Sequence, residues 1–214
     1  MKNIEILHED DFSIAVNKPA GLAVQGGKGV KTSLDNLLAE IRSPAPLLVH
    51  RLDKDTSGVL LAAKGREAAA RFSSLFDSSK PGKVIKIYIA VCLNRPDKNE
   101  GVINEKLLIQ GSYKKSETRY KVIKNGVIES EKLEYSVMEI ELCTGRMHQI
   151  RRHLAMTGNP ILGDDKYGDF SLNKKLRKTA GIKHLLLHAS RLIIKEDFYI
   201  DVTAPLPGYF SEWY

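Results

Sequence analysis

The sequence predicts an α+β protein built on a mainly antiparallel mixed sheet with flanking helices. Apolar segments of strand length follow one another along the chain, whereas helical spacing of apolar residues is confined to three short segments. Strands that succeed one another with few helices between them favour antiparallel pairing over a βαβ array. The 214 residues suffice for a substantial core, and we expect one domain over residues 1–214. The expected strands are residues 4–7, 12–16, 47–49, 59–63, 83–93, 118–123, 133–142, 184–195 and 198–202.

Two helices are expected in the first third of the chain. The first spans residues 34–41, where leucine and isoleucine recur on one face, and Thr32 or Ser33 precedes it as a capping residue. The second spans residues 67–76 and ends in a run of apolar side chains that we expect to be buried.

The segment over residues 83–93 gives the clearest strand pattern. Ile85, Ile87 and Ile89 point to one face, while Lys86 and Tyr88 point to the other. Tyr88 therefore lies on the more polar face, where an aromatic ring can stack on a nucleic-acid base. A half-buried tyrosine in an ordinary sheet is the plainer interpretation of the same pattern.

The composition fits a cytoplasmic protein whose basic surface either binds a polyanionic partner or serves only solubility. The chain has 33 Lys+Arg against 26 Asp+Glu, a net charge of +7, which raises its affinity for nucleic acid or an anionic membrane surface. Two distant cysteines, Cys92 and Cys143, make neither a disulfide framework nor a zinc site and fit a reducing compartment. The N-terminal residues lack the pattern of a signal peptide, and no apolar run is long enough to span a membrane.

Residues 50–58, with the sequence HRLDKDTSG, concentrate reactive groups between two apolar strands. Acids, bases, a histidine and hydroxyls lie on a stretch that ends at Gly58, which is typical of a functional loop on a rigid scaffold. Such a composition also fits a polar turn in which Asp, Thr and Ser only cap the backbone.

The third expected helix begins in a second cluster, residues 144–153. Met147, Ile150 and Leu154 form its predicted buried stripe, and Arg151 lies at the edge of the stripe. A guanidinium there is partly desolvated and needs a carboxylate or phosphate, unless the side chain snorkels to solvent. Arg146, His148 and Arg152 lie further round and can meet phosphates, and Gly158 with Pro160 ends the helix.

Two further patterns resemble binding sites, one for phosphate and one for a metal, but do not meet the requirements of either. Residues 26–32 evoke a phosphate-binding loop, but the spacing of the P-loop motif is absent. His184 and His188 lie four residues apart beside a predicted buried strand with no third ligand, so a metal site is not expected there.

A magnesium-dependent phosphatase is one alternative function. Asp53 and Asp55, together with Asp164 and Asp165, resemble the paired aspartates of haloacid-dehalogenase-type phosphatases. Such a site follows an apolar strand near the start of the chain, whereas residues 49–52 are interrupted by two basic residues.

Taken together, several segments resemble the motifs of RluA-type pseudouridine synthases. HRLDKDTSG is similar to the family signature, residues 17–21 to its opening motif, and residues 86–91 to its K-x-Y-x-A strand. Residues 144–151 are similar to the family's T-G-R-x-H-Q-I-R segment. The later blocks at residues 158–161, 165–168 and 187–189 follow in the same order. The likeness covers about residues 12 to 190.

The resemblance implies roles for four residues. Asp53 corresponds to the catalytic carboxylate, Tyr88 to the residue that stacks on the flipped uracil, and Arg151 to the arginine that pairs with the carboxylate. Arg51 resembles the arginine near the extruded base, and we expect Arg146 and His148 to bind the substrate as well. The family further implies a pseudouridine synthase fold with a central RNA-binding cleft, no metal and no cofactor. We expect a monomer.

Isomerisation of uridine breaks the glycosidic bond, turns the base and rejoins it through carbon. The carboxylate must be ionised to act as a nucleophile or as a base, and a nearby guanidinium favours the ionised form. This is a physical reason to expect Arg151 within about 2.7–3.2 Å of Asp53. An RNA-binding module without catalysis remains an alternative, for which basic charge and Tyr88 suffice.

Within the family, residues 116–122 and 164–169 are most similar to the RluC branch, which modifies 23S large-subunit ribosomal RNA. That branch normally carries an N-terminal S4 RNA-binding domain. Here the catalytic motifs begin almost at Met1, and we expect the chain to lack that domain. Because family members without an S4 domain include transfer-RNA enzymes, a transfer-RNA substrate is the alternative.

Overall fold

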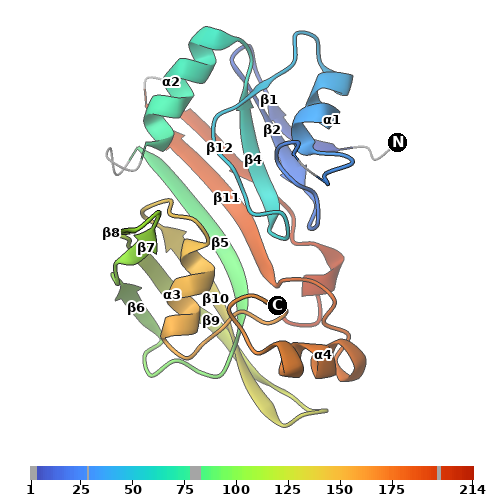
Figure 1. The fold of residues 1–214 in the computed structure, drawn as a ribbon, viewed down its shortest axis with the longest axis vertical. Coiled ribbons are helices and arrows are strands. Elements are labelled where there is room, and N and C mark those ends of the chain that lie inside the picture. The colour runs from blue at the N-terminus through green and yellow to red at the C-terminus, as the bar shows by residue number, and fades with distance from the viewer. Residues whose placement is uncertain (1–3, 28, 78–82, 197–198) are drawn as a thin grey trace. The chain divides into compact units, whose positions relative to one another are not determined.

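The computed structural model describes residues 4–27, 29–77, 83–196 and 199–214. Residue contacts divide the chain into two compact units (Figure 1). Unit 1 comprises Met1–Ile85 and Ala189–Pro205, and unit 2 comprises Lys86–His188 and Leu206–Tyr214. Two of the strands, β5 and β11, contribute residues to both units.

Unit 1 consists of antiparallel strands and two helices. Strands β1, β2, β4 and β11 follow one another in the sheet, β3 pairs with β4, and β12 pairs with β11. The elements are β1 (Glu5–Glu9), β2 (Ser13–Lys18), α1 (Leu34–Ile41), β3 (Leu47–Leu48), β4 (Ser57–Ala63), α2 (Arg66–Phe76), β11 (Leu187–Lys195) and β12 (Tyr199–Thr203).

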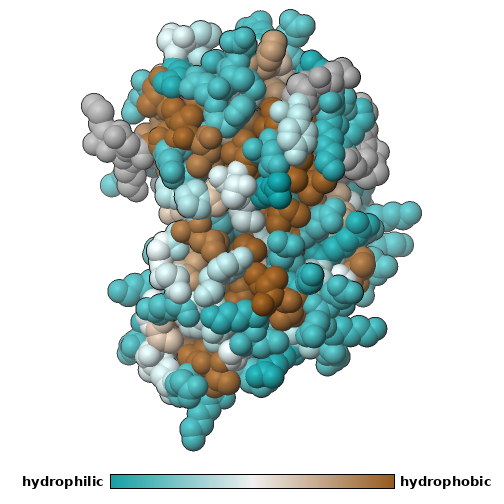
Figure 2. Space-filling view, turned by 180° about the vertical axis from the view of Figure 1, so that it is seen from behind, coloured by the Kyte–Doolittle hydropathy of each residue, from teal (hydrophilic) through white to brown (hydrophobic). Residues whose placement is uncertain are grey.

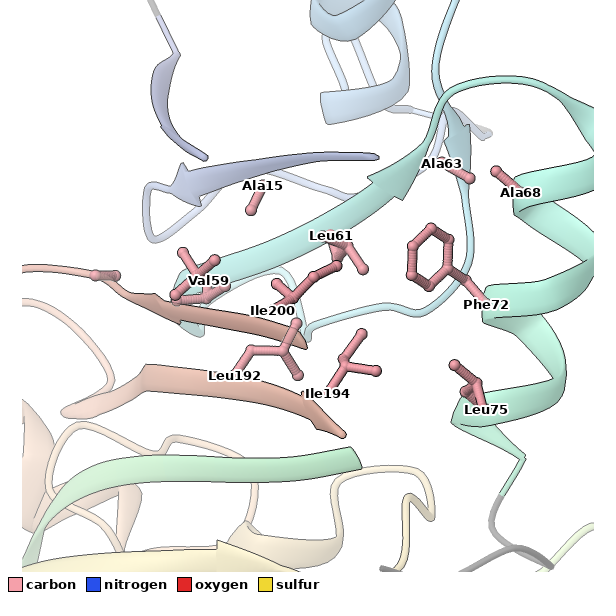
Figure 3. Packing of buried hydrophobic residues seen from close by; sticks show 12 residues of the cluster. Ala15, Val59, Leu61, Ala63, Ala68, Phe72, Leu75, Leu192, Ile194 and Ile200 are labelled. Atoms are coloured by element: carbon pink, nitrogen blue, oxygen red, sulfur yellow. The ribbon is translucent and has the colours of Figure 1, made fainter. Parts of the chain in front are cut away.

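The core of unit 1 lies between these strands and α2. Figure 3 shows Phe72 and Leu75 on α2 with Leu61 of β4 and Ile194 of β11. The remaining members of the cluster are Ala15, Val59, Ala63, Ala68, Leu192, Ile200, Val202 and Ala204. This packing holds β4, and therefore the segment that precedes it, in a fixed place.

Unit 2 is built on a second run of antiparallel strands in the order β5, β10, β9, β6. A separate hairpin is formed by β7 and β8. The elements are β5 (Val84–Leu93), β6 (Glu100–Ile103), β7 (Leu107–Ile109), β8 (Ser112–Lys114), β9 (Thr118–Ile128), β10 (Leu133–Leu142), α3 (Gln149–Met156), α4 (Phe170–Thr179) and the short 3-10 helix η1 (Gly208–Phe210).

Two glycines of unit 2 lie under tyrosine rings on the neighbouring strand. Gly101 is paired with Tyr120 and Gly126 with Tyr135 in the sheet register. A Cβ atom at Gly126 would lie 2.4 Å from the Tyr135 ring, so a larger residue displaces that ring. Trp213 packs edge-on against the same ring, with the centroids 5.1 Å apart.

The predicted α+β class with mainly antiparallel pairing is confirmed, and most predicted strands and helices are present. Ser33 is the residue before α1, but its hydroxyl bonds the Asp35 and Asn36 side chains and caps no backbone N–H. Lys28, in the predicted Gly-rich loop, and Phe198, at the predicted start of the last strand, lie outside the described residues.

The prediction of a buried Met147 was wrong. Its side chain is 61% exposed, because α3 begins two residues later at Gln149. Ile150 and Leu154 are buried as predicted, and Gly158 with φ +78° follows the end of α3. Helix α4 was not predicted, although Asp169 caps it by accepting a hydrogen bond from the Leu172 N–H.

On the face seen in Figure 2 the hydrophobic residues are gathered in patches separated by polar side chains. Across the parts of the chain that the structure describes, no helix combines the length and the hydropathy needed to cross a membrane.

Candidate active site

Asp53 lies on the loop that joins β3 to β4 in unit 1. Its side chain is half-buried, whereas Lys54 and Asp55 are exposed and Leu52 is buried beneath the loop. The N–H of Thr56 donates to the carbonyl of Asp53 at 3.2 Å and closes a turn. The loop therefore presents the Asp53 carboxylate from a backbone that is tied to the start of β4.

Lys18, at the end of β2, holds this loop from the inside of the unit. Its side chain is fully buried, and its ammonium group donates to the carbonyls of Pro19, Leu22 and Lys54 at 2.9–3.0 Å. The N–H of Gly21 donates to the same Lys54 carbonyl at 2.9 Å. The Asn-Lys-Pro-Ala-Gly motif and the HRLDKDTSG motif are thus one structural assembly.

Burial lowers the pKa of Lys18 to about 8, although the charges of Asp55 and Asp53 oppose this shift. The ammonium group remains mostly charged at pH 7, and its three protons match the three carbonyl acceptors. Sequence reasoning assigned Lys18 only to a motif. A lysine in a turn between strands did not by itself indicate a buried charge.

The last residue of the motif, Gly58, has to be glycine for steric reasons. Its φ is +111°, and a Cβ atom would lie 2.1 Å from the carbonyl oxygen of Ala189. His50, at the start of the motif, has a structural place: its Nε2 accepts from the Leu61 N–H at 2.9 Å, and its ring stacks on Phe76. Arg51 is exposed on the same loop.

In unit 2, Tyr88 and Lys86 lie on β5 as the alternation predicted. Tyr88 is more deeply buried than its place on the polar face suggested, with 7% of its surface exposed. Lys86 is half-buried, and desolvation lowers the pKa of its ammonium group. That ammonium lies close to Gly145, where a Cβ atom would be 3.6 Å from its Nζ.

Arg151 is buried on α3 and is held by a carboxylate of its own unit. Its Nε and Nη2 donate to Asp164 Oδ2 and Oδ1, each at 2.7 Å. Burial acts to raise the pKa of Asp164, but the bonds and charge of Arg151 outweigh it and hold that pKa below the usual value. The prediction that Arg151 needs a carboxylate is confirmed.

The loop that leads into α3 is fixed by Gln149. Its Oε1 accepts from the Thr144 hydroxyl at 2.7 Å and from the Arg146 N–H at 3.1 Å. Its Nε2 donates to the Glu117 carbonyl and to the Thr118 hydroxyl. Arg146 and His148 are therefore presented from an ordered backbone, and the Arg146 Nε donates to the Lys115 carbonyl at 3.2 Å.

The structure thus brings Arg146, His148 and Arg151 together at the start of α3 in unit 2. Asp53 and Arg51 share a loop of unit 1. The expected contact between Arg151 and Asp53 joins residues of different units and stays a prediction. Sequence reasoning quoted Tyr167 only inside a matched block and considered Asp164 only there and as a candidate phosphatase aspartate. Neither was identified as a member of the Arg151 cluster.

The arrangement of Asp164 argues against the phosphatase alternative. One of its oxygens accepts from Arg151 and from the N–H groups of Lys166 and Tyr167, and the other accepts from Arg151. Because these donors occupy the carboxylate, it is not available as a magnesium ligand. Asp165 pairs instead with Arg177.

Comparison with known proteins agrees with this geometry. The family model described as RNA pseudouridylate synthase matches residues 12–156. The chain is 36% identical to a protein of Rickettsia felis named ribosomal large subunit pseudouridine synthase C, over 97% of this chain and 69% of that protein. It is 35% identical to a protein of the same name from Vibrio parahaemolyticus, over 94% of this chain and 65% of that protein.

Solved structures give the same result for the fold. Human RNA pseudouridylate synthase domain containing 4 aligns with a TM-score of 0.78 and 26% identity, over 96% of this chain and 90% of that one. The corresponding human domain containing 1 aligns with a TM-score of 0.77 and 25% identity, over 96% and 84%.

These likenesses define an enzyme class, the isomerases that convert uridine to pseudouridine in RNA. The chain belongs to the RNA pseudouridylate synthase family. The fold predicted from the motifs and the predicted enzyme activity are both confirmed.

Proposed function

We propose that this enzyme isomerises specific uridines in large-subunit ribosomal RNA and that Asp53 is its catalytic carboxylate. The observation that carries the assignment is the tethered loop: Asp53 stands one residue before Lys54, whose carbonyl accepts from both Lys18 and Gly21. A reacting group must be held in a fixed geometry by the residues around it. The resemblance gives no catalytic role to Asp55, which is exposed on the same loop.

In this proposal, residues of both units act together in one catalytic domain. Arg151 favours the ionised form of Asp53 by its charge, while Asp164 holds its Nε and Nη2. Tyr88 stacks on the extruded uracil and replaces the stacking that the base loses when it leaves the RNA. The ionised carboxylate attacks the ribose or removes a ribose proton, after which the base turns and rejoins through carbon.

RNA binding is assigned to basic groups of both units. Arg51, Arg146 and His148 contact the RNA near the target base. The exposed hairpin of β7 and β8 adds Tyr113, which is 70% exposed, and Lys114. The net charge of +7 favours a polyanionic substrate. The names of the curated relatives support large-subunit ribosomal RNA as that substrate.

The replacement of Asp53 by Asn tests the proposal because it keeps the shape and removes the charge. We expect Asp53→Asn to lower the turnover of pseudouridine formation by about a thousandfold or more, as when a nucleophile or base is removed. RNA affinity should persist. The assay measures pseudouridine in unmodified large-subunit ribosomal RNA transcribed in vitro.

Asp55→Asn is the matched control, since it removes a carboxylate from the exposed side of the same loop. It should retain turnover close to that of the wild type. Near-normal turnover in Asp53→Asn would refute the role of Asp53. A wild-type protein that binds this RNA and forms no pseudouridine in it would refute the target.

A further inference from the structure

Tyr167 is surrounded by the groups that carry the proposed function in unit 2. Its hydroxyl is hydrogen-bonded to His148 Nδ1 at 2.8 Å, and the two rings meet edge to face with centroids 5.5 Å apart. The guanidinium carbon of Arg151 lies 5.2 Å from the centre of the Tyr167 ring. One side chain therefore contacts both a histidine expected to bind the substrate and the arginine to which the family resemblance gives a role.

The backbone of Tyr167 is fixed by the same carboxylate that holds Arg151. Asp164 Oδ1 accepts from the Tyr167 N–H at 3.1 Å and from the Lys166 N–H at 3.0 Å. The Gly168 N–H donates to the Asp164 carbonyl at 3.0 Å and completes the turn. A Cβ atom at Gly168 would lie 2.7 Å from that carbonyl, so the turn admits only glycine there. Asp164 thus sets the positions of Arg151 and Tyr167 together.

His148 is held in a backbone conformation that helix formation does not explain. Its φ is +53° and its ψ is +30°, in the left-handed region that favours glycine and asparagine. It occupies the capping position of α3, yet its side chain makes no capping hydrogen bond. A histidine in such a conformation points to a function for the ring, since strain of this kind concentrates at functional sites.

We propose that Tyr167 is a positioning residue of this enzyme. Its hydroxyl fixes the orientation of the His148 ring for RNA binding, and its ring supports the Arg151 guanidinium for catalysis. A hydrogen bond at one ring nitrogen of a histidine also selects the proton state of the other nitrogen. The inference rests on the proposed function, because it takes His148 as a substrate-binding residue and Arg151 as a catalytic one.

The two contacts can be separated by two substitutions of Tyr167. Tyr167→Phe keeps the ring under Arg151 and removes the bond to His148. We expect the KM for unmodified large-subunit ribosomal RNA to rise about fivefold, the size of one lost hydrogen bond, with kcat unchanged. Tyr167→Leu removes both contacts, and we expect a further fall in kcat of about tenfold from the lost support of the cation.

A double-mutant cycle shows whether the hydroxyl acts through the histidine. In a His148→Gln background, Tyr167→Phe should cause no further rise in KM, because its partner is already absent. Tyr135→Phe is the matched control: it removes the hydroxyl of a different tyrosine of unit 2, which is buried, and KM should not change. The melting temperature of each variant is measured beside the kinetics.

Additive effects of Tyr167→Phe and His148→Gln on KM would overturn the proposal, as would an unchanged KM in Tyr167→Phe. If kcat falls and KM rises in proportion to a lowered melting temperature, Tyr167 has only a structural role and the proposal is overturned. If the wild-type protein forms no pseudouridine, the proposed function fails. The double-mutant cycle is then carried out with the dissociation constant of the RNA as the measured quantity in place of KM. Non-additive dissociation constants would still support the link between Tyr167 and His148.

Discussion

At the scale of single residues, a charged side chain supports each proposed reactive group: Lys18 bonds the carbonyl of Lys54 next to Asp53, and Asp164 binds Arg151. Asp53 and Arg151 stand out because charged residues lie beside apolar segments, and motif matching gave each a role. The partner of Arg151 in unit 2, Asp164, was not identified, because a separation of thirteen positions along the chain carries no distance information. Lys18 was equally inconspicuous, since only the folded structure shows that its charge is buried.

The burial of Lys18 predicts a pH dependence of stability. Its pKa falls from 10.5 to about 8 on folding, so between these values the unfolded chain binds more protons and stability rises with pH. The rise from this group is about 3 kcal/mol, at about 1.36 kcal/mol for each pKa unit. It is absent below pH 8, where both states are protonated.

Chemical denaturation of the wild type and of Lys18→Met from pH 7 to 10.5 measures this effect. As the pH increases, the free energy of unfolding of the wild type should rise relative to that of Lys18→Met. Lys54→Met, an exposed lysine of the same loop, should follow the wild type. Parallel curves for the wild type and Lys18→Met would contradict the shifted pKa.

At the scale of secondary structure, alternation predicted β5 because isoleucines recur at every second position along it. Helix α4 was missed because its sequence is mostly polar, and among its residues only Asn173 and Leu176 are buried. The short strands β6, β7 and β8 were missed for a similar reason. They bury few side chains, so their sequence lacks the apolar pattern by which the longer strands were recognised.

His153 on α3 should make the β7–β8 hairpin sensitive to acid. It is fully buried, and its ring nitrogens lie 3.0 Å from the Thr118 hydroxyl and 3.0 Å from the Glu105 carbonyl, which precedes the hairpin. Burial lowers the pKa of His153 below 6.5. As the pH falls below 6.5 the unfolded chain therefore binds the proton first, and stability is lost.

Melting temperatures at pH 5 to 7.5 test this expectation. His153→Gln should be less stable than the wild type at pH 7.5, because it loses buried hydrogen bonds, by about 1–3 kcal/mol. Between pH 6.5 and 5 the wild type should lose stability more steeply than the variant. An equal slope in the two proteins would show that His153 does not titrate in this range.

The contact of Gly126 with Tyr135 predicts a large effect of a small substitution. Gly126→Ala adds one methyl group where the ring already lies, and we expect it to destabilise the protein by about 1–3 kcal/mol, as overpacking does. Gly208→Ala is the control, since a Cβ there meets no atom within 4 Å. The melting temperatures of both variants, measured by thermal unfolding, test this prediction. Similar melting temperatures for Gly126→Ala and Gly208→Ala would contradict it.

At the scale of the whole molecule, the order of motifs predicted the fold and the family, while the division into two units left no trace in the sequence. The chain passes between the units inside β5, inside β11 and after Pro205. Two of these crossings occur within strands, where composition is apolar and regular. Linkers rich in Gly, Pro or polar residues, which usually mark boundaries, are therefore absent from them.

In the proposed function the choice of target RNA depends on the whole molecule, because the summed charge and the basic residues of both units are assigned to RNA binding. An enzyme that holds RNA through phosphates binds it less tightly as salt increases, and base contacts then decide which uridine is chosen. We expect a strain that lacks the gene to lose pseudouridine at particular positions of large-subunit ribosomal RNA. Position-resolved mapping of total RNA, with and without the gene, measures this. Restoration by the wild-type gene but not by Asp53→Asn would assign the loss to this enzyme. A loss confined to transfer RNA would leave the enzyme class intact and refute the ribosomal target.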